Sequence, residues 1–154
     1  CALPIYWSVL FLIAAFVPVG TAMQTTGTAA FLAQGILRVQ SINPDVFTPL
    51  VILSVLYLLT SLLTQTISNN ATAILMAPIA IQLAIELGVD ARPFLIAVTF
   101  AASAGLMTPY GYQTNLMVMG PGGYRFMDFV RFGGPLTIVF WVLASLPIPT
   151  IWSF

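Results

Sequence analysis

The sequence predicts an all-α polytopic membrane protein, and three observations support this fold class. Hydrophobic residues make up 60% of the 154 positions and charged residues only 5%, which leaves too little polar surface for a water-soluble globule. The apolar residues form long blocks, as membrane helices require. Two of these blocks are interrupted by short polar segments that carry no charge. We therefore expect helices that cross or enter a bilayer, some of them broken.

The composition also excludes several classes of function. Four basic and four acidic residues give a formal net charge of zero, and no basic stripe is present that could bind nucleic acid. The sequence has no His and one Cys, so it cannot supply an imidazole or thiolate metal site or a Ser/His or Cys/His catalytic pair. An intramembrane enzyme is disfavoured because all the acidic residues lie at segment ends. Since the chain starts at Cys1 rather than Met, we expect a fragment rather than a lipidated N-terminus.

The first two segments are compared with the roughly 20 residues that cross a hydrocarbon core of about 30 Å. Residues 1–23 carry no charge and have Tyr6 and Trp7 as interfacial aromatic residues, so they are predicted to form a span. Residues 24–42 interleave polar and apolar side chains, which predicts an amphipathic helix lying along the membrane surface. A turn of Asn43, Pro44 and Asp45 is expected to end this helix.

Residues 46–87 are predicted to form a re-entrant helical hairpin. No charge occurs between Asp45 and Glu86, a length of about 40 residues or about 60 Å of helix, which is twice one crossing. The chain is expected to turn back in the polar segment from Thr64 to Thr72. The alternative is an ordinary hairpin whose tip reaches water, but such turns usually carry Pro, Gly, Lys or Asp. The sequence therefore favours a tip near the bilayer midplane.

Residues 93–126 are predicted to form a broken transmembrane helix, followed by a last span at 131–154. Pro109 removes a backbone donor and disfavours α geometry at Thr108, while Gly111 permits φ values that other residues avoid. A simple proline kink is the alternative, but a kink would not need the Thr, Gln and Asn residues that follow Pro109. A discontinuous helix is the better interpretation.

The two predicted breaks suggest a transport function. Each break exposes free carbonyl groups and free amide groups side by side, so it can hold a cation and an anion together. Two broken segments in one hydrophobic chain are typical of a secondary transporter. Ser68, Asn69 and Asn70 offer neutral donors to an anion, and a carboxamide oxygen can face a hard cation. A channel would need a ring motif or a polar stripe. A non-transporting membrane scaffold or assembly subunit is the other alternative, although it does not explain the polar breaks.

The segment Ser68-Asn69-Asn70-Ala71-Thr72-Ala73, followed by Leu75-Met76-Ala77-Pro78, resembles the Ser-Asn-Thr signature of the divalent anion/sodium symporters, the solute carrier 13-type permeases. Residues 109–115 and 117–128 resemble the second Pro…Asn loop of this family and the Gly-Tyr…Asp segment after it. The resemblance covers nearly the whole chain. The sequence departs from the family pattern where Asn70 replaces Thr and where Tyr112-Gln113-Thr114 replaces Thr-Pro-Pro, so the anion stays open between a dicarboxylate and sulfate.

The resemblance implies that the chain is the second of two inverted-topology repeats, the C-terminal half of a transporter whose first repeat is absent here. It implies symport of a small divalent anion with sodium ions, although an anion carrier with other ion coupling is an alternative. It also implies a homodimer in the lipid bilayer of the cell membrane, which we expect to be a bacterial inner membrane. The implied substrate contacts are Ser68, Asn69, Asn70, Thr108, Pro109, Tyr110 and Gly111. The implied sodium contacts are Thr64, Ile67, Asn69 and Met107, with Ile67 and Met107 contributing backbone carbonyl groups.

Overall fold

The computed structural model describes residues 7–40 and 48–152, and its regular structure in these ranges is entirely helical. The predicted all-α class is therefore confirmed. Tyr6 and the predicted turn at Asn43 to Asp45 lie outside the described residues. The helices are α1 (Trp7–Thr25), α2 (Thr28–Gln40), α3 (Pro49–Leu63), α4 (Asn69–Leu87), α5 (Arg92–Ala102), α6 (Gln113–Met119), α7 (Phe126–Ser145) and α8 (Pro147–Ile151).

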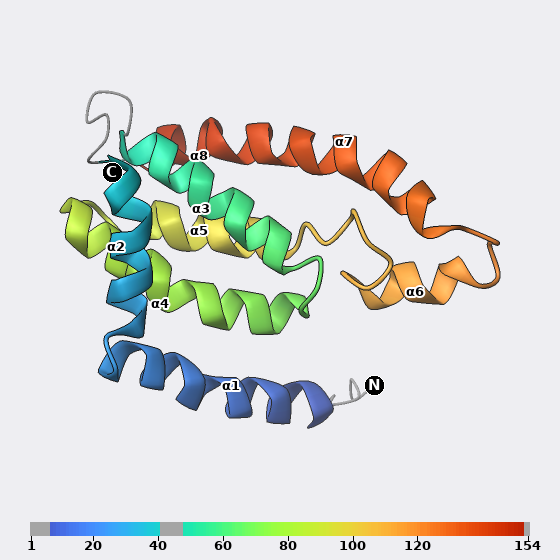
Figure 1. Ribbon diagram of the computed structural model, residues 1–154, viewed down its shortest axis with the longest axis horizontal. Coiled ribbons are helices and arrows are strands. Elements are labelled where there is room, and N and C mark those ends of the chain that lie inside the picture. Colours follow the sequence, from blue (N-terminus) through green and yellow to red (C-terminus); the bar gives the residue numbers. More distant parts are fainter. Residues whose placement is uncertain (1–6, 41–47, 153–154) are drawn as a thin grey trace, which may run out of the picture.

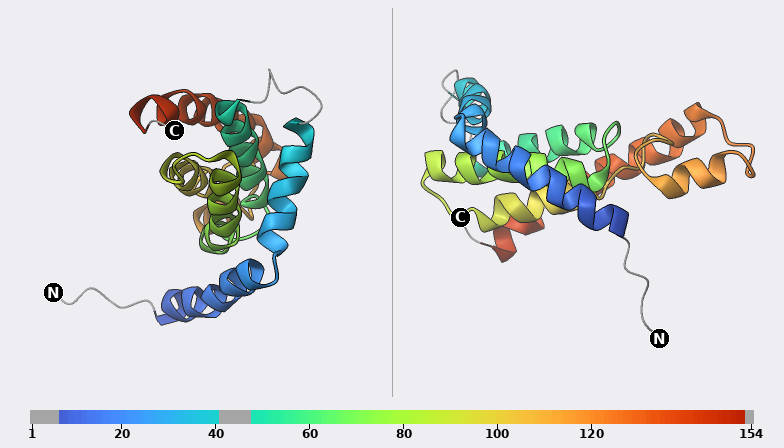
Figure 2. Two further views of the ribbon diagram at one scale, coloured as in Figure 1. Left: turned by 90° about the vertical axis from the view of Figure 1, so that its left-hand side faces the viewer. Right: turned by 90° about the horizontal axis from the view of Figure 1, so that it is seen from below.

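Helices α1, α3, α4, α5 and α7 lie along the long direction of the molecule, and α2 runs across them at one end (Figure 1). The end-on view in Figure 2 shows α4 between α1 on one side and the α3, α5 and α7 layers on the other. The chain turns from α1 into α2 at Gly27, whose φ of 72° is in the left-handed region that favours glycine. Ala29 and Ala33 then face the core from α2, which packs across α4.

Helices α3 and α4 form an antiparallel hairpin with a short turn at residues 64–68, hereafter the hairpin turn. Pro49 starts α3 in the first helical position, where its missing N–H costs nothing. Ser68 is the N-cap of α4, and its Oγ accepts a hydrogen bond from the Ala71 amide at 3.4 Å. At about 1.5 Å per residue, α3 is about 22 Å long and α4 about 28 Å long. The turn falls inside the polar segment that the sequence analysis singled out.

The core lies where α3, α4 and α5 meet, and small residues let these helices approach closely. Ala80 and Ala84 on α4 and Ala97 and Ala101 on α5 are at most 1% exposed. In lipid the hydrophobic effect does not drive helices together, so van der Waals packing between closely spaced backbones must do so. Larger side chains such as Phe94, also fully buried, fill the spaces between them. This packing fixes the position of the hairpin against α5.

The helical run that begins with α5 is interrupted after Ala102, and residues 103–112 form an irregular connection to α6, hereafter the α5–α6 loop. Helix α6 and the start of α7 extend beyond the rest of the bundle (Figure 1). Helix α7 begins at Phe126, earlier than the predicted start at 131, and Asp128 accepts a hydrogen bond from the Arg125 amide at 2.8 Å at its first turn. Further along, Trp141 Nε1 donates to Ser54 Oγ at 2.9 Å and joins α7 to α3.

Two helices within the described ranges, Asn69–Leu87 and the continuous α7–α8 segment Phe126–Ile151, are long and apolar enough to cross a membrane. Helices α3 and α5, with 15 and 11 residues, are shorter than a full crossing requires. The hairpin therefore pairs one helix that is long enough to cross with a shorter one.

Helix α7 packs directly on the α5–α6 loop at Gly133, and this contact generates a testable prediction. A Cβ atom at Gly133 would overlap the carbonyl group of Leu106, whereas a Cβ atom at the neighbouring Gly134 would meet nothing within 4 Å. We expect Gly133→Ala to lower the free energy of unfolding by about 1–3 kcal/mol through overpacking. Gly134→Ala is the matched control, and it should be neutral or stabilising because alanine favours the helix.

Thermal unfolding of the two purified variants in detergent measures this difference. If Gly133→Ala unfolded at the same temperature as Gly134→Ala, the close approach of α7 to the α5–α6 loop would be contradicted.

Candidate functional site

The ends of α3, α4 and α5 meet at one place, where Thr64 connects them. Thr64 is fully buried, and its Oγ1 donates to the carbonyl oxygen of Ala102, the last residue of α5, at 2.6 Å. The same hydroxyl oxygen lies 2.8 Å from the carboxamide of Asn69, the first residue of α4. The hydroxyl therefore joins the C-terminus of α3 to the N-terminus of α4 and to the C-terminus of α5.

The carboxamide of Asn69 faces three oxygen atoms that come from three different segments. They are Thr64 Oγ1 at 2.8 Å, the Ala102 carbonyl oxygen at 3.0 Å and the Gly111 carbonyl oxygen at 3.2 Å. Both carbonyl oxygens are acceptors, and the hydroxyl already donates to Ala102, so the amide NH₂ group must face them. Three converging oxygens form the kind of environment that binds a hard cation. We call Thr64 Oγ1 and these two carbonyl oxygens the oxygen cluster.

Gln65 fastens the hairpin turn to the α5–α6 loop. Its side chain is buried, and its Nε2 donates to the Ala104 carbonyl oxygen at 3.0 Å and to the Ser61 carbonyl oxygen at 3.1 Å. Its Oε1 accepts from the amides of Met107 and Thr108 at 3.0 and 3.2 Å. The backbone of the loop forms no regular helix at these positions, so its polar groups need other partners. The Gln65 side chain provides a hydrogen-bond partner for three of them, the Ala104 carbonyl group and the amides of Met107 and Thr108.

The α5–α6 loop is folded back on itself and closed by side chains. Asn115 Nδ2 donates to the carbonyl oxygens of Gly105 and Thr108, both at 3.1 Å, and the Thr108 hydroxyl accepts from the Gly111 amide at 3.0 Å. Two glycines cross where the loop folds: a Cβ atom on Gly105 would lie 2.7 Å from the Gly111 carbonyl oxygen. Larger residues at these two positions would push the two crossing segments of the loop apart and move the Gly111 carbonyl oxygen, which belongs to the oxygen cluster.

A cleft of about 710 Å³ opens beside the oxygen cluster. This volume is typical of small-molecule sites. No residue that lines it carries a formal charge, and all except Gly111 and Met117 offer hydroxyl, phenol or carboxamide groups: Ser68, Asn69, Asn70, Ser103, Tyr110, Gly111, Tyr112, Gln113, Thr114 and Met117. The N-terminus of α4 also faces the cleft, since Ser68, Asn69 and Asn70 contribute to its wall. The first amides of a helix have no partner within it and carry positive partial charge.

The structure brings together most of the residues predicted for the site. Ser68, Asn69, Asn70, Tyr110 and Gly111 line the cleft, and Thr64 belongs to the oxygen cluster next to it.

The remaining predicted residues have other surroundings. Thr108 and Pro109 are not among the residues that line the cleft: the Thr108 hydroxyl donates to the Gln65 carbonyl oxygen at 2.7 Å, and Pro109 is buried. Ile67 lies in the hairpin turn, where its amide donates to the Leu63 carbonyl oxygen at 3.0 Å. Met107 presents its amide to Gln65, and the α5 carbonyl group in the oxygen cluster is that of Ala102.

Sequence reasoning missed three residues that build the site. Gln65 and Asn115 could have been suspected, because a carboxamide within an apolar block must find several partners if it is buried. Nothing in the sequence could indicate the carbonyl group of Ala102, because every residue in an apolar run has the same backbone oxygen. Its role follows only from where α5 ends.

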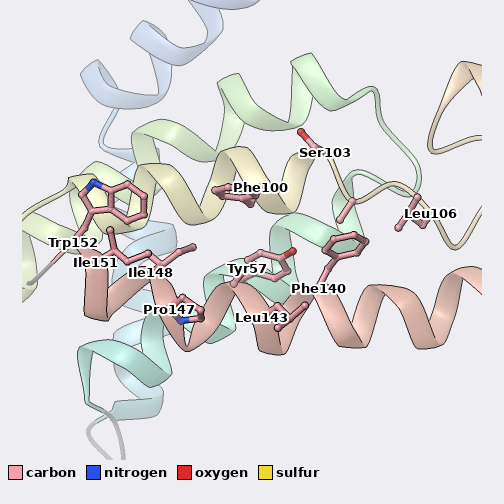
Figure 3. Close-up of a pocket in the computed structure, with 12 residues that line it drawn as sticks. Tyr57, Phe100, Ser103, Leu106, Phe140, Leu143, Pro147, Ile148, Ile151 and Trp152 are labelled. Atoms are coloured by element: carbon pink, nitrogen blue, oxygen red, sulfur yellow. The ribbon is translucent and has the colours of Figure 1, made fainter.

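A second cavity, of about 560 Å³, lies between α3, α5, α7 and α8, and Figure 3 shows the side chains around it. Its lining is mostly aliphatic and aromatic, with the hydroxyl groups of Tyr57 and Ser103 and the indole N–H of Trp152 as polar exceptions. Moving an anion into such surroundings would cost its hydration without replacing the lost hydrogen bonds. Of the two cavities, the cleft beside the oxygen cluster is therefore the one suited to a small anion.

Helix ends that meet around a polar cleft, inside an otherwise apolar helical body, are typical of secondary transporters. The family comparison agrees with this class. The model of the citrate transporter family matches residues 1–94 and 74–154, so the chain belongs to this family of membrane transporters. The family resemblance seen in the sequence is thereby confirmed.

Relatives with transporter names match almost the whole chain. An uncharacterized transporter of Synechocystis sp. is 46% identical over 149 residues, which are 97% of this chain and 24% of the relative. An uncharacterized transporter of Escherichia coli is 38% identical over 97% of this chain and 24% of its own length. Sodium/sulfate cotransporter 2 of Chlamydomonas reinhardtii is 35% identical over 92% of this chain and 16% of its own length. The chain thus spans about a quarter or less of these relatives.

The contacts of Thr64 predict a specific loss of stability. Thr64→Val keeps the shape of the side chain but removes two hydrogen bonds, one to the Ala102 carbonyl oxygen and one from the Asn69 carboxamide, which should cost about 1–3 kcal/mol of unfolding free energy. Thr60→Val is the matched control, because buried Thr60 donates within its own helix to Leu56 at 2.7 Å. That carbonyl group keeps its helical partner, so the control should lose less.

Unfolding of both variants, followed in detergent by circular dichroism, measures the two losses. Equal losses would mean that the Thr64 hydroxyl adds nothing beyond packing.

Proposed function

We propose that this chain is the C-terminal half of a secondary transporter that moves a small divalent anion, a dicarboxylate or sulfate, together with sodium ions. The observation that carries the proposal is the position of Asn69. Its side chain faces the oxygen cluster while its residue also lines the neutral cleft. One carboxamide can coordinate a cation through its oxygen and donate from its NH₂ group to an anion, so this residue can couple the two ligands directly.

The oxygen cluster supports sodium as the coupling ion. Hydroxyl and carbonyl oxygens are hard, uncharged ligands, and they can replace part of the hydration shell of a small cation without adding negative charge next to the anion. In this proposal Thr64 and the carbonyl groups of Ala102 and Gly111 contact the ion, and the Asn69 carboxamide, whose NH₂ group faces these oxygens in the structure, rotates to turn its oxygen toward the ion. Ile67 and Met107 remain proposed backbone contacts. Relatives named sodium/sulfate cotransporters support the same ion.

The cleft supports an anionic substrate. The N-terminus of the 19-residue helix α4 presents positive partial charge there, and Ser68 and Asn70 extend its donors into the cleft. Because no residue that lines the cleft carries a formal positive charge, the negative charge of the anion must be balanced by ions that bind with it. In this proposal bound sodium ions provide the positive charge. Tyr110 and Gly111 are proposed to face the substrate from the α5–α6 loop, with Thr108 and Pro109 behind them.

The orientation of α2 supports the proposed membrane topology. It runs across the axes of the other long helices (Figure 1), as a helix lying along the membrane surface would if those helices enter the bilayer. In this topology the α3–α4 hairpin is re-entrant, residues 93–126 form a broken membrane helix, and the chain is one of two inverted repeats. We extend the proposal to a homodimer of complete transporters in a cell membrane, such as the bacterial inner membrane.

The direct test is uptake by the complete transporter in liposomes. Labelled sulfate, succinate and citrate are offered under an inward sodium gradient, and the gradient is replaced in parallel by potassium or protons. We expect sodium-driven uptake of sulfate or succinate. Uptake that follows the proton gradient alone would replace sodium with another coupling ion, and absence of uptake of all three anions would overturn the proposal.

Asn69→Asp is expected to separate the two ligands. The carboxylate keeps an oxygen for sodium but places a negative charge beside the anion, with a repulsion on the order of 4 kcal/mol at about 4 Å and an effective dielectric near 20. Anion binding should then fall by several hundredfold or more, while some sodium affinity remains. Asn69→Ala should abolish transport without unfolding the protein.

Gln24→Glu, which adds the same charge on an exposed position of α1, serves as the control and should leave uptake unchanged. Anion affinity in Asn69→Asp equal to that of the control would exclude the N-terminus of α4 as the substrate site.

Cysteine labelling tests the re-entrant placement of the hairpin, in a cysteine-free transporter. Leu50 and Ile85, 37% and 65% exposed, lie at its base, and exposed Asn70 lies at its tip. We expect Asn70→Cys to react only with small reagents and to be protected by sodium and substrate, unlike Leu50→Cys and Ile85→Cys. Reaction of Asn70→Cys with a bulky impermeant reagent from one side, and never from the other, would indicate an ordinary hairpin.

A further inference from the structure

Gln65 connects the hairpin turn to the α5–α6 loop through more hydrogen bonds than any residue predicted to bind a ligand. Its carboxamide accepts from two amides and donates to two carbonyl groups, at distances between 3.0 and 3.2 Å, and is 6% exposed. Three of these four partners, at Ala104, Met107 and Thr108, lie in the α5–α6 loop, about 40 positions away in sequence. In addition, the Gln65 carbonyl oxygen accepts from the Thr108 hydroxyl at 2.7 Å.

Gln65 does not line the cleft, so it cannot act by touching a substrate there. It follows Thr64 in the chain, and its loop partners lie between Ala102 and Gly111, whose carbonyl groups belong to the oxygen cluster. The distance between Asn69 and those two carbonyl groups therefore depends on the loop being held against the hairpin turn. Gln65 is the side chain that holds it.

We propose that Gln65 is a positioning residue: it fixes the α5–α6 loop to the hairpin turn and thereby sets the apparent affinity for the cotransported cation. This inference rests on the proposed function for its consequence in transport. The structural part of it, the attachment of the loop, stands independently of what is transported.

A carboxamide is the one side-chain group that fits these four partners. Glutamate has the same length, but both oxygens of its ionised form are acceptors, and one would face the Ala104 and Ser61 carbonyl oxygens. A protonated glutamate regains one donor. The four direct partners of Gln65 use backbone groups and carry no ionisable side chain.

Ionisable residues on the surrounding elements lie further away or would add to the repulsion. Tyr57 lies two turns earlier on α3, Tyr110 is in the loop, and Glu86 and Arg92 are at the far ends of α4 and α5. Asp128 of α7 lines a small cavity with Leu106 and would oppose a second negative charge. A glutamate at position 65 should therefore become protonated readily as the pH falls.

Hydrogen exchange in the complete transporter, in lipid nanodiscs at one pH, tests the attachment of the loop. The amides of Met107 and Thr108 should exchange about tenfold faster or more in Gln65→Ala than in the unmodified protein, because each loses its acceptor. Gln34→Glu, on an exposed position of α2, is the control and should not change their exchange. Unchanged exchange at Met107 and Thr108 in Gln65→Ala would overturn the inference, whether or not the protein transports an anion.

Transport tests the consequence. Gln65→Ala should raise the sodium concentration for half-maximal uptake by about tenfold at every pH. Gln65→Glu should behave like Gln65→Ala near pH 8 and recover towards the unmodified protein near pH 5.5, a pH profile that Gln34→Glu lacks. If Gln65→Ala and Gln65→Glu were equally impaired at all pH values, or unimpaired, positioning by the carboxamide would be refuted. Absence of sodium-driven uptake in the unmodified protein would instead refute the proposed function, and the exchange measurement would still decide the attachment.

Discussion

The structure depends on one requirement: backbone groups left free where helices end inside an apolar body must find partners in the protein. Helices α3 and α5 end, and α4 begins, at the same level of the bundle (Figure 1). Thr64, Gln65, Thr108 and Asn115 pair the amides and carbonyl groups of the loops at these ends. These four polar side chains lie together because the free backbone groups need partners there, and a polar cleft opens beside them in an otherwise apolar protein.

Much of the fold could be predicted because its signals are local. The all-helical class follows from composition and block length, and the hairpin turn falls within Thr64 to Thr72 because that segment is the polar interruption in a long apolar run. Pro109 and Gly111 likewise lie in an irregular loop, as their restricted and permitted φ values favour. At the site, Asn69 could be predicted together with Ser68 and Asn70, because these three polar side chains follow one another in the interruption of an apolar run and resemble a family signature.

The rest could not be predicted because it depends on contacts between segments distant in sequence. The carbonyl oxygen of Ala102 faces Thr64 because α5 ends there, 38 positions later in the sequence. The identity of an alanine gives no indication of this contact. The partners of Gln65 are hidden for the same reason. The packing of α7 on the α5–α6 loop depends on which of two adjacent glycines, Gly133 or Gly134, faces Leu106. The sequence does not distinguish between these two glycines.

Asn115 has a consequence for how transporters of this design can diverge. It ties the start of α6 to the loop through Gly105 and Thr108, while the oxygen cluster is held by Thr64 and Gln65 on the opposite side. The side chains at 112–114 face the cleft from α6 and its N-terminal boundary without belonging to the oxygen cluster. Under the proposed function, exchange of these side chains would fit the cleft to a new anion and leave the proposed cation contacts unchanged, so that one ion gradient could drive the uptake of different nutrients.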